Sequence, residues 1–392
     1  MGISGVKKPR EKAILVGVAT TSLSAKTIRE HLAELGRLAD TAGADVVETT
    51  MQRRDKFDAS TMVGAGKVQE IADLVEQHCA DLVIFDEDLS GSQVKKLEAA
   101  IATKILDRSG IILDIFAKHA KTAEAKVQVE VAQLEYMLPR LTNAWTHLSR
   151  QAGGVGIGMR GPGETQLEVD KRLVRKRIAD LNRKLEKMQT IREAQHDRRI
   201  PTFHIAVVGY TNAGKSTLMN ALTRAGVESA DKLFATLDPT TRKIWLGAQK
   251  AAVLSDTVGF IRKLPVGLVA AFKSTLSVAA QATLILHLVD ASADDFEDQM
   301  EITAKILSEL CPEETDRLTV FNKIDLLSEE RLEFLKLHHP QAIFVSAQTK
   351  INLDDLRIRL GEYYDQSHFA SQSKDHDPSE SASSSNSPLK WT

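Results

Sequence analysis

The 392-residue sequence has little cysteine and no long hydrophobic run. The two cysteines, Cys79 and Cys311, lie far apart, so a disulfide framework is not expected and a reducing compartment fits best. The longest apolar runs, such as residues 13–19 and 284–289, are far shorter than the ~20 residues of a membrane-spanning helix. The basic N-terminus lacks the apolar stretch of a secretory signal. We expect no membrane span and a cytoplasmic location, with peripheral membrane association left open.

The composition is that of a globular protein with room for two or three domains. Hydrophobic residues make up 43% and charged residues 27% of the chain, which is ordinary for a folded protein. Strand-like and helix-like runs alternate in residues 11–115, which predicts a small parallel α/β domain over residues 1–117. The alternation resumes at residue 202 and predicts a second doubly wound sheet within residues 201–364.

Two further segments have a different character. Long helical patterns cover residues 118–141 and 164–198 with a glycine-rich loop between them, and they most simply fold as an antiparallel helical hairpin within residues 118–200. The last segment, residues 365–392, is rich in serine and almost without apolar residues. It is expected to be a disordered tail.

A phosphate-binding loop follows the apolar strand pattern at residues 202–209. The string GYTNAGKST matches Gly-x4-Gly-Lys-Ser and leads into a helical pattern. Glycines let backbone N–H groups surround phosphates, the lysine reaches the β- and γ-phosphates, and the serine hydroxyl binds magnesium. The residues expected to bind the nucleotide here are Gly209, Tyr210, Thr211, Asn212, Ala213, Gly214, Lys215, Ser216 and Thr217.

Two later motifs occur in the order that a nucleoside triphosphatase needs. In FATLDPTTRK, Thr236 is the first candidate to bind magnesium and the γ-phosphate, and Thr240 and Thr241 are the alternatives. Turn formation is the competing explanation for the threonines at these positions. Asp256 ends an apolar run and Gly259 follows three residues later, so the carboxylate can hold magnesium through water while the glycine N–H meets the γ-phosphate. Lys215, Thr236 and Gly259 are the predicted catalytic residues, and Ser216, Thr236 and Asp256 are the predicted magnesium site.

The last motif predicts that guanine is the base. LTVFNKID places Asn322, Lys323 and Asp325 at the end of an apolar strand, and a carboxylate there can accept hydrogen bonds from two neighbouring donors of guanine that adenine does not offer together. Ser346 and Ala347 end the next strand pattern, where their backbone can close over the base. Each string is common by chance, but the ordered set predicts a GTPase that binds GTP and GDP with Mg2+.

Phe260 follows Gly259, where Ras-type GTPases carry a glutamine that orients the attacking water. A phenyl ring offers no hydrogen bond, so the isolated enzyme is expected to position water poorly. Two explanations stay open: another loop, potassium or backbone groups replace the glutamine, or a docked partner completes the site.

Residues 140–199 are basic, with 14 Lys and Arg against 7 Asp and Glu, in a chain of net charge −2. A basic helical pair with a protruding loop suits the phosphates of structured RNA, although a solvated helix face explains such charge as well. Few aromatics lie nearby, which disfavours a stacking platform for single strands. Arg150 and Arg160 in the glycine-rich loop are the candidate RNA contacts.

The string VGAGKVQEI contains Gly64, Gly66 and Lys67. Its spacing is not that of a phosphate-binding loop, so a helix-capping turn is favoured over a second nucleotide site.

Beyond the GTPase motifs, the sequence resembles the HflX family of ribosome-associated GTPases over nearly the whole chain before the tail. The strings that carry the resemblance are VGAGKVQEI, FDEDLS, ILDRSGIILDIFAKHA, KVQVEVAQLEYMLPRL, LSRQAGGVGIGMRGPGETQLEVDKR and FATLDPTTR.

The resemblance implies an N-terminal module that docks on the large ribosomal subunit and its rRNA near the peptidyl-transferase region. It also implies GTP-dependent splitting or rescue of ribosomes under stress, with slow hydrolysis alone and faster hydrolysis on the ribosome. We expect a monomer without a membrane partner. The competing classes are a GTPase of RNA modification, a switch that binds only proteins, and a factor that binds GTP without turnover.

Overall fold

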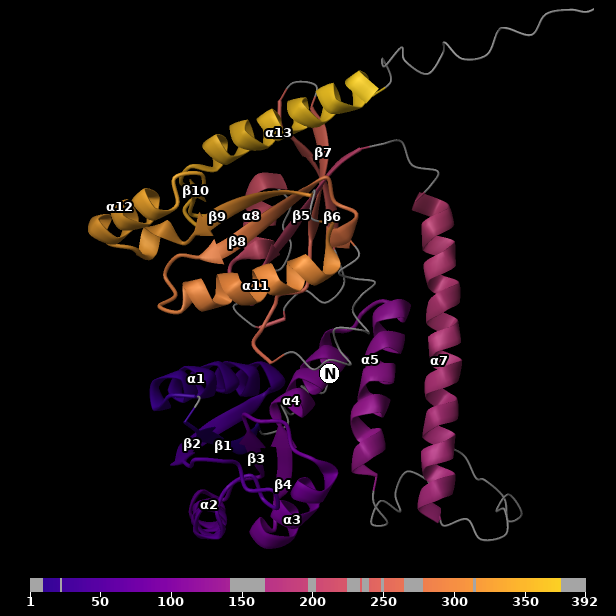
Figure 1. Cartoon of the computed structure of the whole chain (residues 1–392), viewed down its shortest axis with the longest axis vertical. Coiled ribbons are helices and arrows are strands. Elements are labelled where there is room, and N and C mark those ends of the chain that lie inside the picture. The colour runs from indigo at the N-terminus through magenta and orange to yellow at the C-terminus, as the bar shows by residue number, and fades with distance from the viewer. Residues whose placement is uncertain are drawn as a thin grey trace, which may run out of the picture. The chain divides into compact units, whose positions relative to one another are not determined.

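The computed structural model describes residues 10–21, 23–141, 166–196, 202–223, 233–234, 240–247, 250–263, 278–312 and 315–374. The chain forms two compact units. The first contains the described residues up to position 196 together with residues 233–234 and 258–263, and the second contains the others. Figure 1 shows the strands and helices of both units.

The first unit is built on a four-stranded parallel sheet in the order β2-β1-β3-β4. Its central strand β1 is buried from Ala13 to its end, as expected for a parallel strand that is covered on both faces. The strands are β1 (Glu11–Ala19), β2 (Ala44–Arg53), β3 (Leu82–Phe85) and β4 (Lys104–Asp107), and the helices are α1 (Ala25–Ala42), α2 (Ala65–His78), α3 (Gly91–Ile101) and α4 (Arg108–His119). The predicted small α/β fold of this region is confirmed.

The predicted helical pair also belongs to the first unit and consists of α5 (Ala123–Met137), the short 3-10 helix η1 (Leu138–Arg140) and α7 (Gln166–His196). Val127 and Val131 of α5 pack against Leu181 of α7, and the two helices run side by side in Figure 1. The predicted start of the first helix was wrong. α4 ends at His119, and α5 begins only after Thr122, whose side chain accepts a hydrogen bond from the backbone of the new helix.

A buried carboxylate connects this helical pair to the sheet. Asp107 ends β4 and is fully buried. Its oxygens accept hydrogen bonds from the Tyr136 hydroxyl at 2.6 Å, the Arg140 guanidinium at 2.7 Å and the Leu89 N–H at 3.0 Å. Burial and the neighbouring Asp107 raise the pKa of Tyr136, so its hydroxyl keeps the proton that it donates. The end of α5 is therefore held at the carboxyl edge of the sheet.

The second unit contains a six-stranded sheet in the order β10-β9-β8-β5-β7-β6. All neighbouring pairs are parallel except β6, an edge strand that runs antiparallel to β7. The strands are β5 (Phe203–Gly209), β6 (Thr240–Trp245), β7 (Ala251–Asp256), β8 (Leu284–Asp290), β9 (Asp316–Asn322) and β10 (Ile343–Phe344). The helical elements are α8 (Lys215–Thr223), α11 (Phe296–Leu310), η2 (Ile324–Leu326), α12 (Glu329–His338) and α13 (Leu353–Lys374).

The last helix extends further than the sequence predicts. α13 continues to Lys374, although the disordered tail was predicted to begin at residue 365. Its first turns are fixed in the core through Leu353, Leu356 and Leu360, and a helix propagates from a fixed start more easily than it nucleates. The rest of the predicted tail lies outside the described residues. Among the helices that are described, none is long and apolar enough to span a membrane.

Candidate nucleotide-binding site

The predicted nucleotide-binding residues of the second unit gather at the carboxyl edge of its sheet. Strands β5, β7 and β9 end at Gly209, Asp256 and Asn322, and Ser346 follows the end of β10. Open α/β sheets bind ligands outside the carboxyl ends of their strands. The arrangement therefore brings together four motifs that are far apart in the sequence.

The backbone of the phosphate-binding loop needs its glycines. Gly209 and Gly214 have φ angles of +157° and +93°, where side chains are strained. A Cβ on Gly209 would lie 2.2 Å from the Leu288 carbonyl oxygen, and one on Gly214 would lie 2.4 Å from Nδ2 of Asn322. The neighbouring strands therefore leave space only for a bare backbone at both positions, as the motif predicts.

Lys215 lies at the start of α8, inside the loop. Its ammonium donates hydrogen bonds to the carbonyl oxygens of Tyr210 at 2.9 Å and Gly209 at 3.2 Å. Burial lowers the pKa of Lys215 to about 8, with the charge of Asp256 acting in the opposite direction. Phosphate oxygens would supply the negative charge that an ammonium needs in such a buried position.

Ser216 and Asp256 provide the oxygen atoms of the predicted magnesium site. The Ser216 hydroxyl donates to Oδ2 of Asp256 at 2.6 Å, so the two groups are close enough to serve one hard cation. These donors fit Mg2+, which binds few protein ligands and takes the rest from phosphates and water. Thr236 lies outside the described residues. The alternative Thr241 shares a hydrogen bond with the Ser255 hydroxyl at 3.0 Å.

Asn322 connects the phosphate-binding loop to the loop after β10. Its buried amide donates to the Ala213 carbonyl at 2.8 Å and accepts from the Ala347 N–H at 2.9 Å. Lys323 follows with a left-handed φ of +65° and an ion pair to Asp290 at 2.6 Å. Asp290 was not among the predicted site residues, although its place at the end of β8, between β5 and β9, is the kind of position that marks a ligand site.

The base-reading residues lie beside this connection. Asp325 is exposed in η2, as a carboxylate that is to bind a base must be. Ser346 is buried, and its hydroxyl accepts from the Thr349 N–H at 3.1 Å, which shapes the loop whose backbone at Ala347 was predicted to close over the base. The guanine contacts themselves stay a prediction.

Gly259 and Phe260 follow the end of β7, and residues 258–263 belong to the first unit. Thr257 still bonds within the second unit, where its hydroxyl donates to the Val207 carbonyl at 2.8 Å. The Phe260 side chain is 1% exposed, so this residue packs and can neither orient nor deprotonate a water.

The glycine-lysine string of the first unit forms a helix cap. Gly64 is the N-cap of α2, and its N–H donates to the Gln52 side chain at 2.9 Å. The Lys67 ammonium is paired with Glu70 at 2.5 Å, which satisfies it within the helix. The favoured capping-turn interpretation thus agrees with the geometry.

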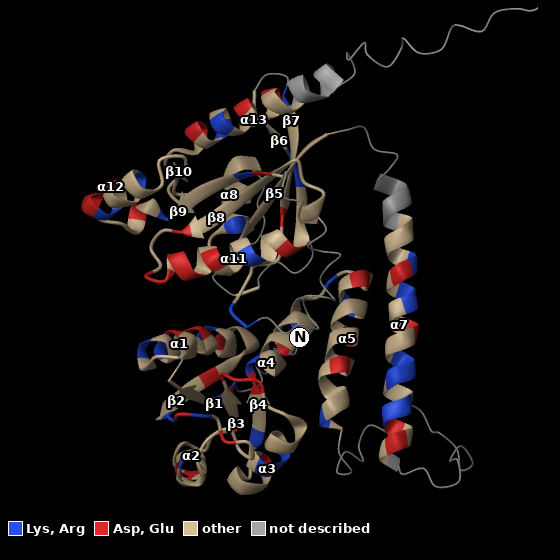
Figure 2. Cartoon of the chain, viewed as in Figure 1, with Lys and Arg blue, Asp and Glu red and all other residues tan. Residues whose placement is uncertain are grey.

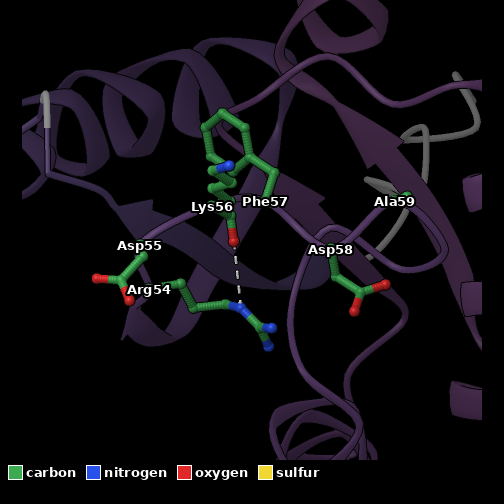
Figure 3. A pocket seen from close by; sticks show the side chains of 6 residues that line it. All are labelled: Arg54, Asp55, Lys56, Phe57, Asp58 and Ala59. Atoms are coloured by element: carbon green, nitrogen blue, oxygen red, sulfur yellow. Dashed lines mark hydrogen bonds between the residues drawn. The ribbon is translucent and has the colours of Figure 1, made fainter.

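An open pocket lies in the loop before this cap (Figure 3). Its lining alternates in charge, and Nε of Arg54 donates to the Lys56 carbonyl at 3.3 Å. The lining residues are Arg54, Asp55, Lys56, Phe57, Asp58 and Ala59. No phosphate-binding loop is part of it.

The fold and the site together define a GTP hydrolase with a phosphate-binding loop. The chain matches three family models, described as GTP-binding GTPase N-terminal (residues 29–117), GTP-binding GTPase Middle Region (residues 119–199) and 50S ribosome-binding GTPase (residues 204–323).

Two curated relatives are similar to this chain over most of its length. The GTPase HflX of Caldanaerobacter subterraneus subsp. tengcongensis is 48% identical over 89% of this chain and 79% of its own, and that of Escherichia coli K12 is 44% identical over 90% and 82%. The chain belongs to the HflX family. A crystal structure of SsGBP in complex with GDP has the same fold, with a TM-score of 0.51 and 24% identity over 91% of this chain and 99% of that one.

Proposed function

We propose that this GTPase binds the large ribosomal subunit and couples GTP binding and hydrolysis to the splitting or rescue of ribosomes under stress. The nucleotide is GTP or GDP, and Ser216 and Asp256 would hold Mg2+, which neutralises phosphate charge when bound. Thr236 would complete the magnesium site, and Gly259 would meet the γ-phosphate. A ribosomal partner implies a cytoplasmic location and a role in translation, and we propose that the protein is a monomer.

The observation that carries the proposal is the buried Phe260, 1% exposed, at the position after Gly259. A glutamine at this position orients water in Ras-type GTPases, and a buried phenyl ring cannot replace it. The isolated enzyme therefore hydrolyses GTP slowly, and a docked partner supplies what the chain lacks. The name of the matching GTPase model, which specifies 50S binding, supports the ribosome as that partner.

The exposed face of α7 supports contact with RNA. One side of this helix packs on α5 through Ile178, Leu181 and Leu185, and the blue segments in Figure 2 mark its many basic residues. A row of exposed cations along a rigid helix suits the phosphates of a structured RNA. The exposed basic residues of the helix are Arg172, Arg175, Lys176, Arg177, Arg183, Lys184 and Lys187.

Cosedimentation with isolated large and small ribosomal subunits tests the proposal. With a non-hydrolysable GTP analogue the protein should pellet with the large subunit, and with GDP it should stay largely in the supernatant. Reversing the charges at Lys176, Lys184 and Lys187 should weaken pelleting and make it less dependent on salt. Equal pelleting with GTP analogue and GDP would contradict the coupling, and no pelleting with either would contradict the ribosomal partner.

A further inference from the structure

Strand β6 is an edge strand of the second unit that is long enough to pair with another segment. It has 6 residues and pairs with β7 alone, whereas β10 at the opposite edge has 2 residues. An edge strand presents a row of unpaired N–H and C=O groups. No described residue bonds to the outer edge of β6. The backbone of β6 can therefore accept an added strand.

The side chains of β6 point to the two faces of the sheet in turn. Ile244 is buried in the core, and the alternation of side chains along a strand puts Arg242 on that same face. Lys243 and Trp245 lie on the opposite face. All three of these other side chains are exposed. Exposed cations thus flank the free edge on both faces of the sheet.

The charge of β6 is of one sign and is not balanced by its surroundings. The strand TTRKIW contains no carboxylate. Among the described residues, neither Arg242 nor Lys243 has an acidic partner. Lys243 instead lies over the indole of Trp245, with its Nζ 4.6 Å from the ring centroid. The edge therefore offers positive charge and an aromatic surface to a partner.

Cations on an edge strand can also serve to prevent unwanted strand pairing, and β2, an edge strand of the first unit, shows the difference. The strand β2, ADVVETTMQR, carries carboxylates as well as an arginine, and its Asp45 is paired with Arg10 at 2.8 Å. Protection from pairing also gives no reason for Trp245, which is 57% exposed. A large exposed aromatic residue beside unpaired cations is more typical of a binding surface.

We propose that β6 binds an extended acidic segment of a protein partner, which adds to the sheet as a further strand. In this binding mode main-chain hydrogen bonds supply affinity and the alternating side chains supply specificity. Two consecutive carboxylates in the segment would point to opposite faces of the sheet, one toward Arg242 and the next toward Lys243. An apolar residue two positions further on would lie beside the ring of Trp245. The inference does not depend on a ribosomal partner.

A single-stranded nucleic acid and a second copy of the chain fit this surface less well. A nucleic acid with a base stacked on Trp245 would follow one face of the sheet and leave Arg242, on the other face, without a phosphate. A second β6 strand would place cations opposite cations across the new strand pair, which is destabilising. Only an acidic strand uses the free edge and both cations.

Binding of a short peptide, followed by fluorescence anisotropy, tests the proposal. The probe is blocked at both ends and consists of threonine and valine, with two consecutive glutamates at its centre and a valine two positions after the second. A matched peptide with glutamines in place of the glutamates should bind about fivefold more weakly or less. Combining Arg242→Gln with Lys243→Gln should weaken binding of the acidic probe by a similar factor of about five.

Control variants separate this surface from general charge and from the fold. Combining Lys305→Gln with Lys336→Gln removes the same charge from exposed positions of α11 and α12, and should leave binding of the probe unchanged. Trp245→Ala should weaken binding by about threefold, because the ring no longer covers the apolar residue of the probe. GDP affinity should stay native in all these variants, since none of the residues belongs to the nucleotide site.

Two N-methylated forms of the probe separate strand addition from simple attraction of charge. The N–H groups of successive residues in a strand point to opposite edges, so methylation at every second residue blocks one edge only. One methylated form should lose about tenfold or more in affinity. The form methylated at the other positions should bind like the unmodified probe.

Several results would overturn the proposal. The first is a failure of the acidic probe to bind, and the second is equal binding of the two methylated forms or of the native and doubly substituted proteins. A uridine oligonucleotide that binds through Lys243 and Trp245 but not through Arg242 would make a nucleic acid the occupant. Self-association in sedimentation experiments that the double substitution abolishes would make a second copy of the chain the occupant.

Discussion

Replacement of Asn322 by alanine should weaken nucleotide binding and also lower the free energy of unfolding of the second unit. The amide of Asn322 is the partner of two buried backbone groups, the Ala213 carbonyl at 2.8 Å and the Ala347 N–H at 2.9 Å. A buried polar group without a partner costs about 1–3 kcal/mol. For two such groups the penalties sum to about 2–6 kcal/mol. We expect a loss of stabilising free energy of about 2–4 kcal/mol, because water can enter the space that the side chain leaves and bind the two backbone groups.

Denaturant unfolding measures how much of this loss appears in the free energy of unfolding, and GDP titration measures how much appears in the affinity for GDP. If the phosphate-binding loop stays folded but loses its shape, GDP affinity should drop by roughly 30- to 700-fold, the same free energy expressed as a ratio. Asn352→Asp is the control, because it removes a single amide donor, to the Phe344 carbonyl at 2.9 Å, and should cost about 1 kcal/mol with unchanged GDP affinity. An Asn322→Ala protein with native stability and native GDP affinity would refute the role of this side chain as the connection between the two loops.

The remaining predictions concern charge and base recognition. Burial lowers the pKa of Lys215 to about 8 in the protein alone, and phosphates bind the protonated ammonium. GDP affinity, measured by calorimetry, should therefore fall by up to about tenfold per pH unit above pH 8. A GDP affinity that stays constant up to pH 9.5 would contradict this. Asp325→Asn should change the preference from guanine to xanthine nucleotides in competition assays, and retained GTP preference would count against base reading by this carboxylate. Charge reversal at Arg150 and Arg160 should weaken cosedimentation with ribosomes at unchanged nucleotide affinity, and unaltered cosedimentation would exclude them as RNA contacts.

Local signals account for what could be predicted from the sequence. The phosphate-binding loop is recognisable because glycine spacing, the preceding strand and the following helix lie within one continuous string, and the structure has β5 before it and α8 after it. The alternation of strands and helices in the same way predicts both α/β sheets. Parallel sheets also bring strand ends to one edge, so the meeting of Asp256 and Asn322 with the loop follows from topology alone.

The features that could not be predicted depend on distant or weak signals. The break between α4 and α5 depends on one capping threonine, Thr122, within an otherwise helical pattern. The antiparallel direction of β6 depends on pairing with β7, which a short strand pattern does not specify. The ion pair between Lys263 and Asp86 joins residues 177 positions apart, and no periodicity in the sequence links the two.

We propose that this GTPase depends on the ribosome to position the water that Phe260 cannot orient. Steady-state GTP hydrolysis by the purified protein, alone and with isolated large ribosomal subunits, measures this directly. We expect slow turnover by the protein alone and strong stimulation by the large subunit but not by the small one. A fast intrinsic rate that large subunits leave unchanged would contradict it, because the water would then be positioned within the chain itself.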